Sequence, residues 1–253
     1  MNVLIACEES QEVCKAFRKR GHRAFSCDIA DCSGGHPEWH IKSDVLPLLN
    51  GRCEFTLADR QTDRQTDRWD IIIAFPPCTH LCVSGAMFFE KKREDGRQRE
   101  GVEFFCKFLE ADCDRIAIEN PIGIISGDYV AEYYPDLAEK YGLPKKPTQV
   151  IQPWMFGDNY AKSTCLWLKG LRELEPEVTE EPALEWFDWI DGKTGKKKRQ
   201  PKWYADAFHL SAEERARVRS KTFPGIARAM AEQWGGGYTP KQLTFYDLID
   251  QMQ

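Results

Sequence analysis

Two segments of the chain carry residue types that could act together on a substrate. Cys78 follows two prolines directly after the apolar run 69–75, so a thiol stands on a rigid turn at the end of a strand. Such a thiol can attack a carbon atom when a helix start or a nearby cation lowers its pKa. Glu119 follows the apolar run 115–118 and could protonate or hydrogen-bond a ring nitrogen. The alternatives are an inert buried cysteine and an ordinary turn with a solvated carboxylate.

Short apolar runs alternate with helical patterns over the first two-thirds of the chain. This alternation predicts an α/β fold with a mainly parallel sheet flanked by helices. The predicted strands are 2–7, 23–27, 69–75 and 115–118. In such sheets, ligands bind beyond the carboxyl ends of the strands. Residues at those ends should therefore meet at one rim, and they are Cys7, Asp28, Phe75 to Cys78, and Glu119.

Helix signals separate the strands. Ser10 can cap a first helix that buries Val13 and Phe17 on one face and ends at Gly21. A late helix is predicted at 224–234, with proline in its first turn and large apolar residues at every fourth position. Its pattern predicts that the chain returns to the main domain there.

The composition limits the classes of protein to consider. With 253 residues, 42% hydrophobic and 30% charged, the chain is expected to be a soluble globular protein of one domain with room for an appendage. Because the net charge is −5, a nucleic acid would have to bind a local basic patch. We find no apolar run of the ~20 residues that a membrane span needs and no signal-peptide pattern, so we expect a cytoplasmic protein that does not bind membranes. The ten cysteines are then reduced thiols, and their spacing does not predict a metal site.

With these residues in this order, the chain resembles the DNA cytosine-5 methyltransferase family, in the compact form found in phages and prophages. The resemblance rests on Pro77-Cys78 after one strand and Glu119-Asn120 after the next. It implies a Rossmann-like methyltransferase fold, S-adenosylmethionine as cofactor and DNA as substrate. It also implies that Cys78 attacks carbon 6 of cytosine while Glu119 stabilises the protonated ring nitrogen, so that carbon 5 accepts a methyl group.

The resemblance further implies a cofactor site along the rim. The loop after the first strand is glycine-rich in the family, whereas here it contains no glycine and supplies Ala6, Cys7, Glu8 and Ser10. Acidic side chains in this loop can face the sulfonium or amino group of the cofactor. Asp28 corresponds to the residue that binds the ribose hydroxyls, and Asp44 with Val45 to the pair that binds adenine. Phe75 and Pro76 would line the far side of the cofactor pocket.

A later basic motif of the family, Gln-x-Arg-x-Arg, is matched loosely by 160–164. Only one cation is kept there, and Lys162 could contact the ring carbonyl or a phosphate. The resemblance thus implies that Lys162 is a catalytic residue together with Cys78 and Glu119. The substrate contacts predicted around them are Pro77, Ser84, Asn120 and Thr164.

Changes in composition predict three parts: a catalytic and cofactor-binding domain at 1–170, a small recognition lobe at 171–222, and a C-terminal helix at 223–253 that returns to the catalytic domain. The lobe is basic and aromatic, which suits phosphate contact and base stacking, although a solvated loop would explain it too. Its predicted DNA contacts are Lys197, Lys198 and Arg199. A tandem Arg-Gln-Thr-Asp repeat at 60–68 is expected to be a solvated loop, with a basic arm as the alternative.

Other functions remain open from the sequence. The same chemistry on RNA or on a cytidine nucleotide is one alternative, because the recognition lobe is small. A catalytically inactive relative that still binds nucleic acid is another, because the cofactor loop lacks glycine. An amino methyltransferase would stack the flipped base on an aromatic residue, and Cys78 stands in its place. No obligate protein partner is evident.

Overall fold

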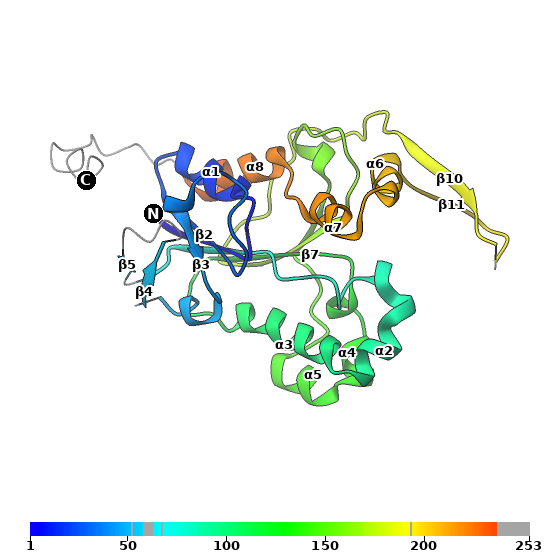
Figure 1. Cartoon of the computed structure of the whole chain (residues 1–253), viewed down its shortest axis with the longest axis horizontal. Coiled ribbons are helices and arrows are strands. Elements are labelled where there is room, and N and C mark those ends of the chain that lie inside the picture. The colour runs from blue at the N-terminus through cyan, green and yellow to red at the C-terminus, as the bar shows by residue number, and fades with distance from the viewer. Residues whose placement is uncertain (52, 58–62, 67, 193, 237–253) are drawn as a thin grey trace.

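The computed structural model describes residues 1–51, 53–57, 63–66, 68–192 and 194–236, and Figure 1 shows their arrangement. A seven-stranded sheet has the order β3-β2-β1-β6-β7-β9-β8. Strands β3, β2, β1, β6 and β7 run parallel, whereas β9 is antiparallel to both of its neighbours. The strands are β1 (Asn2–Ala6), β2 (Arg23–Asp28), β3 (His40–Lys42), β6 (Ile71–Ala74), β7 (Ile116–Pro121), β8 (Gln149–Ile151) and β9 (Thr164–Lys169).

Helices cover both faces of this sheet (Figure 1). Helices α1 and α8 pack together on one face, and α3 packs on the other with α5 beside it. The α-helices are α1 (Glu12–Lys19), α2 (Phe89–Glu94), α3 (Arg97–Leu109), α4 (Tyr129–Tyr133), α5 (Pro135–Tyr141), α6 (Lys202–Asp206), α7 (Ala212–Ser220) and α8 (Pro224–Trp234). The 3₁₀ turns are η1 (Pro37–Trp39), η2 (Leu46–Leu48), η3 (Val83–Phe88), η4 (Ile124–Ser126), η5 (Pro153–Phe156) and η6 (Ala207–His209).

The predicted α/β class is confirmed, including the flanking helices and the mainly parallel sheet. Counted among the strands of this sheet alone, the order is 3-2-1-4-5-7-6, whose first five positions have the order of Rossmann folds. The central strands are buried on both faces, because alternate side chains enter different cores. Ile71 and Ile73 pack toward α1 and α8, whereas Ile72 packs toward α3. No helix among the described residues is long and apolar enough to cross a bilayer.

The first helix begins differently from the prediction. Val13 and Phe17 are buried on α1 as expected, but Ser10 does not cap it. The N-cap residue is Gln11, which has a left-handed φ of 60° and no side-chain capping bond. Instead, the carboxylate of Glu8 accepts hydrogen bonds from the backbone N–H groups of Val13 at 2.6 Å and Cys14 at 3.2 Å. A carboxyl group at this position satisfies two N–H groups that have no partner within the helix.

Strand β7 extends past its predicted end. The antiparallel strand β9 continues alongside it, and it pairs Glu119 with Leu166 and Asn120 with Cys165. Glu119 and Asn120 therefore lie inside a strand, and not in the turn that follows one. Backbone pairing with β9 fixes the positions of Glu119 and Asn120, because each of them lies opposite one defined residue of that strand.

The repeat segment also differs from the prediction. Residues Asp63–Thr66 form β5, which pairs antiparallel with β4 (Cys53–Thr56), so a solvated loop is wrong for this part of the repeat. Backbone pairing stabilises a strand that has no apolar pattern to predict it. The remaining repeat positions 60–62 and 67 lie outside the described residues.

Residues 171–222 contain a hairpin of β10 (Trp186–Ile190) and β11 (Lys197–Pro201), which projects from one end of the molecule in Figure 1. Helices α6 and α7 follow it. Trp203 on α6 connects residues 171–222 to the loop before β9, because its indole N–H donates to the carbonyl oxygen of Ala161 at 3.1 Å. Its ring also packs edge-on against Tyr160 and Phe223.

Helix α8 returns to the sheet as predicted. Ile226, Met230 and Trp234 are all buried against α1 and the strands. The start of the helix is held by Gly225, whose N–H donates to Asp158 Oδ2 at 2.8 Å. A Cβ at Gly225 would lie 2.2 Å from the carbonyl oxygen of Phe156, so only glycine allows this approach. Residues 237–253 of the predicted C-terminal part lie outside the described residues.

Candidate active site

The strand order reverses between β1 and β6, and ligands in open α/β sheets bind at this point. The backbone N–H of Phe75 donates to the carbonyl oxygen of Ala6 at 2.9 Å, so the ends of both strands are tied together. Cys7 and Glu8 follow β1 here, and the Pro76–Cys78 turn follows β6. The reversal therefore brings the two predicted loops to one rim.

Cys78 begins a tight turn and is half-buried. Its carbonyl oxygen accepts hydrogen bonds from the N–H groups of Leu81 and Cys82, both at 2.9 Å. The turn places the thiols of Cys78 and Cys82, here called the thiol pair, within hydrogen-bonding contact. The Cys82 sulfur also lies 3.1 Å from Ser84 Oγ. Cys78 is therefore a partly accessible thiol with a second thiol as its neighbour.

The two thiols of the pair have pKa values shifted in opposite directions. The hydrogen bond between the two thiols lowers the pKa of Cys82, with help from Ser84, the N–H of Gly85 and the ammonium of Lys92. The pKa of Cys78 is raised by the same bond, by burial and by the nearby Glu119 carboxyl. The two shifts have opposite directions, so a negative charge on the pair is favoured on Cys82 over Cys78.

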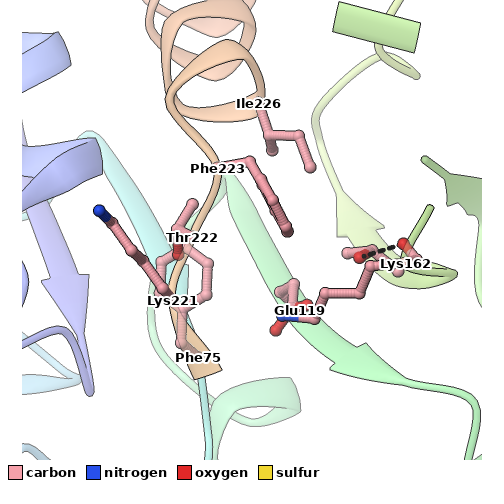
Figure 2. A pocket seen from close by; sticks show the side chains of 8 residues that line it. Phe75, Glu119, Lys162, Lys221, Thr222, Phe223 and Ile226 are labelled. Carbon is pink, nitrogen blue, oxygen red and sulfur yellow. Dashed lines mark hydrogen bonds between the residues drawn. The ribbon is translucent and has the colours of Figure 1, made fainter. Parts of the chain in front are cut away.

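Glu119 and Lys162 face a small hollow (Figure 2), and the charges of both act on Cys78. Burial raises the pKa of the Glu119 carboxyl, and the Lys162 ammonium opposes this shift. Lys162 extends toward Glu119 and also lies over the ring of Phe223, 5.9 Å from its centroid. The residues that line the hollow are Phe75, Glu119, Lys162, Thr164, Lys221, Thr222, Phe223 and Ile226.

The three residues assigned to catalysis thus gather at one place. Cys78 comes from the end of β6, Glu119 from β7 and Lys162 from the loop before β9. The charges of Glu119 and Lys162 both act on the Cys78 thiol. A thiol, a carboxyl with a raised pKa and an ammonium can together add a nucleophile to a ring and protonate its nitrogen.

The predicted substrate contacts have different environments. Asn120 is buried, and its side-chain amide donates to the carbonyl oxygen of Pro76 at 2.7 Å. Thr164 is also buried, and its hydroxyl donates to the carbonyl oxygen of Lys162 at 3.0 Å, the dashed line in Figure 2. These two side chains hold the turn of Cys78 and the backbone of Lys162 in place. Pro77 and Ser84 are exposed next to the thiol pair.

The predicted cofactor residues form an acidic cluster around Cys7. Burial raises the pKa of the Cys7 thiol, and the carboxylates of Asp28 and Asp44 raise it further, so both lie near this thiol. One oxygen of Asp28 accepts from the N–H of Ala30 at 2.9 Å, and one of Asp44 accepts from the N–H of Leu46 at 3.1 Å. Cys7 itself has a left-handed φ of 58°, which turns the chain sharply at the end of β1.

Other predicted cofactor residues point elsewhere. Ala6 and Val45 are buried with their side chains in the core on the α3 side. The Glu8 carboxylate caps α1, which takes it away from the rim, and Ser10 is half-buried in the loop before α1. Phe75 lines the hollow, and Pro76 is buried with its carbonyl oxygen bound to Asn120.

The residues at the rim fit S-adenosylmethionine in chemistry. Its sulfonium and ammonium groups are cationic, and the carboxylates of Asp28 and Asp44 give the rim a negative charge. Free carboxylate oxygens are also good acceptors for ribose hydroxyls. Within the described residues, no group of three or more His, Cys, Asp or Glu side chains is placed to hold a metal ion.

Several residues of the site were not predicted from the sequence. The segment before α8 supplies Lys221, Thr222 and Phe223 to the hollow, although only the helix after it was predicted from the pattern. Cys82 was considered only among the ten cysteines, whose spacing does not predict a metal site. Its separation of four residues from Cys78 was the available signal, since residues four apart share one face of a helical turn.

The predicted DNA contacts of the lobe lie on the projecting hairpin and not at the hollow (Figure 1). Lys197 is 2.9 Å from Asp188 Oδ2, and Lys198 pairs with Asp191. The guanidinium of Arg199 stacks over the ring of Trp186, 3.9 Å from its centroid. All three basic side chains are exposed, so the hairpin presents a charged and aromatic surface to solvent.

Comparison with known proteins adds little to this picture. No family model and no curated protein matches the chain. Among solved structures, the chain is similar to a candidate DNA modification methyltransferase encoded within a prophage of E. coli. The TM-score is 0.43 and the identity 14%, over 72% of this chain and 52% of that chain. The chain thus spans about half the length of that structure. The likeness is low. The function must therefore be inferred from the site.

Proposed function

We propose that this protein is an S-adenosylmethionine-dependent methyltransferase that methylates carbon 5 of cytosine in DNA through a covalent adduct with Cys78. One observation supports this most. The Cys78 thiol and the Glu119 carboxyl come from the ends of adjacent parallel strands, and the charge of one acts on the other. Cytosine methylation at carbon 5 needs these two groups on opposite sides of one ring.

In the first step, the S–H proton of Cys78 passes to water as its sulfur bonds to carbon 6 of the cytosine ring. Glu119 donates a proton to the ring nitrogen at position 3, and its raised pKa supports this role because the carboxyl keeps its proton closer to neutral pH. Lys162 contacts the ring carbonyl oxygen or the adjacent phosphate. Carbon 5 thereby becomes electron-rich.

When bound, S-adenosylmethionine supplies the methyl group. Asp28 and Asp44 would hold the ribose and adenine side of the cofactor, and Phe75 would line the far side of its pocket. After transfer, carbon 5 loses its proton to water and Glu119 takes back the ring proton. The bond between Cys78 and carbon 6 breaks, and the departing thiolate recovers a proton from water. The enzyme then returns to its starting protonation state.

DNA would lie along the surface between the hollow and the hairpin. A cytosine in duplex DNA must leave the base stack to reach Cys78, which costs a few kcal/mol. We propose that residues 171–222 act as a recognition lobe, in which Lys197, Lys198 and Arg199 contact phosphates. The exposed ring of Phe187 and the partly exposed rings of Trp186 and Trp189 support this role, because bases stack on such rings.

The test is methyl transfer from tritiated S-adenosylmethionine to duplex DNA, single-stranded DNA, RNA and cytidine triphosphate. Transfer to DNA is expected, and it should be lost in Cys78→Ser but kept in Cys32→Ser, which changes a half-buried thiol elsewhere. Transfer to RNA or to the nucleotide in preference to DNA would reassign the substrate. Binding of DNA without transfer to any of the four would instead identify an inactive relative.

DNA that carries 5-fluorocytosine gives a sharper test of the nucleophile. Fluorine blocks the final elimination, so the adduct accumulates and can be located by mass spectrometry of the digested protein. The adduct is expected on Cys78. An adduct that still forms in Cys78→Ser would rule out the proposed nucleophile.

A further inference from the structure

The loop before β9, residues 160–163, is held by side chains from two parts of the chain. The backbone N–H of Lys162 donates to Gln152 Oε1 at 2.8 Å, and this bond comes from the segment before the loop. The indole N–H of Trp203 donates to the carbonyl oxygen of Ala161 at 3.1 Å, and this bond comes from α6. The peptide group directly before Lys162 is therefore tied to the part of the chain that we propose as the recognition lobe.

The ammonium of Lys162 lies against an aromatic cluster that also contains Trp203. It is 5.9 Å from the centroid of the Phe223 ring (Figure 2). The Phe223 ring contacts Tyr160, with centroids 5.1 Å apart, and meets Trp203 edge-on, with centroids 5.9 Å apart. Trp203 and Tyr160 also meet edge-on at 5.9 Å. Trp203 therefore contacts both the backbone before Lys162 and the ring against which its ammonium lies.

Trp203 also stands at the base of the projecting hairpin. Strand β11 ends at Pro201, which pairs with Trp186 at the start of β10. Helix α6 begins at the next residue, Lys202, whose N–H donates to the carbonyl oxygen of Glu185 at 2.9 Å. The base of the hairpin is thus fixed to the first turn of α6. The indole of Trp203 lies where the hairpin meets the loop of Lys162.

We propose that Trp203 is a positioning residue, which holds Lys162 at the substrate site through Ala161 and Phe223. This assignment rests on the proposed function, because it takes Lys162 as a group that contacts the cytosine ring or its phosphate. A lysine side chain has a flexible four-carbon stem, so its ammonium keeps one place only where the surroundings fix it. A small displacement of such a group lowers the rate of a reaction strongly. The contacts of Trp203 do not depend on the substrate.

A purely structural role for Trp203 has different consequences. If the indole only attached the hairpin to the rest of the protein, its loss would loosen the recognition lobe and weaken DNA binding, whether or not Lys162 was present. If the indole positions Lys162, its loss lowers the rate at saturating DNA. It then has no further effect in a protein that lacks the Lys162 side chain.

The first experiment is a double-mutant cycle on the rate of adduct formation at saturating 5-fluorocytosine DNA. It compares the wild type, Trp203→Phe, Lys162→Ala and the double variant. Trp203→Phe keeps an aromatic ring but removes the indole N–H, so the rate is expected to fall at least about tenfold while the Kd for DNA changes less than about twofold. In the Lys162→Ala background, the same substitution is expected to change nothing further. Effects that multiply in the double variant, or a loss confined to Kd, would overturn the positioning role.

The matched control is Trp234→Phe. The indole N–H of Trp234 donates to the carbonyl oxygen of Arg172 at 2.9 Å, at the opposite end of α8 from Phe223. The control therefore loses a hydrogen bond of the same kind away from the hollow. Its adduct rate and its Kd for DNA are expected to match those of the wild type. An equal fall in rate in Trp203→Phe and Trp234→Phe would assign the effect to general destabilisation and contradict the proposal.

The second experiment needs no nucleic acid. Amide hydrogen exchange in peptides that cover residues 158–166 is followed by mass spectrometry in the wild type, Trp203→Phe and Trp234→Phe. Exchange at 160–163 is expected to become at least about fivefold faster in Trp203→Phe and to stay unchanged in Trp234→Phe. Unchanged exchange in Trp203→Phe would overturn the proposal, because the indole would then not hold the loop. If no protein forms an adduct, the proposed function fails, whereas the exchange rates still decide whether Trp203 fixes the loop of Lys162.

Discussion

The side-chain amide of Asn120 donates a 2.7 Å hydrogen bond to the carbonyl oxygen of Pro76. This bond joins the end of β7 to the turn that follows β6, and Asn120 is only 2% exposed. The two strands carry Glu119 and Cys78, so the bond sets the distance between the proposed acid and the proposed nucleophile. Asn120 was predicted as a substrate contact, but the bond also gives it a role in positioning the site.

Asn120→Ala should therefore damage both stability and catalysis. It leaves the buried Pro76 carbonyl without this donor, which costs about 1–3 kcal/mol of unfolding free energy. Urea denaturation measures that cost, and the rate of 5-fluorocytosine adduct formation measures the displacement of Cys78. The matched control is Asn159→Ala, because Asn159 is exposed. Equal stability of the two variants would show that the bond contributes nothing.

Glu8 should make the protein less stable as the pH rises. Burial raises the pKa of its carboxyl from 4.5 to about 8, so the folded chain binds a proton in this range that the unfolded chain has lost. The free energy of unfolding therefore falls between these two pH values, by up to about 1.4 kcal/mol per pH unit. Urea denaturation at several pH values measures the slope. Glu8→Gln should flatten it, while Glu94→Gln on the surface of α2 should leave it unchanged.

Gly225→Ala should destabilise the protein and disturb the hollow. The new Cβ would lie 2.2 Å from the Phe156 carbonyl oxygen and 2.6 Å from Asp158 Oδ2, so the start of α8 must move. We expect a loss of more than about 2 kcal/mol, which thermal or urea denaturation measures. Gly127→Ala is the control, because a Cβ there meets no atom within 4 Å. A wild-type Tm for Gly225→Ala would contradict the packing of α8 described above.

Arg199→Ala should weaken DNA binding in a way that depends on salt. If its guanidinium contacts a phosphate, the slope of log Kd against log salt concentration should fall by about 0.9, with a similar loss for every DNA sequence. Arg172→Ala serves as the control, because Arg172 is exposed and lies outside the hairpin. Fluorescence anisotropy at several salt concentrations measures both slopes. A slope equal to that of the wild type would remove the hairpin from the DNA-binding surface.

Local patterns were enough to predict much of the fold. The apolar runs of β1, β2, β6 and β7 were all recognised, because a strand buried on both faces needs continuous apolar residues. Helices α1 and α8 were found from the spacing of Val13 and Phe17 and of Ile226, Met230 and Trp234. The order of these elements was then sufficient for the α/β class and for a common rim at the strand ends.

Features that depend on a distant partner were not predictable. Strand β5 and the end of β7 exist because another strand pairs with their backbone, and no side-chain pattern records such pairing. The capping of α1 by Glu8 depends on how the chain turns at Cys7, where φ is positive.

The amino-acid order alone determined which residue types stand at the strand ends, since hydrophobic periodicity and turn residues are local properties. Only the folded chain decided their environment. The hydrogen bond between the thiols of Cys78 and Cys82, the raised pKa of Glu119 and the approach of Phe223 to Lys162 come from burial and contact between segments far apart in sequence. These interactions act over a few ångströms in three dimensions, so the tertiary structure is the first level at which they exist.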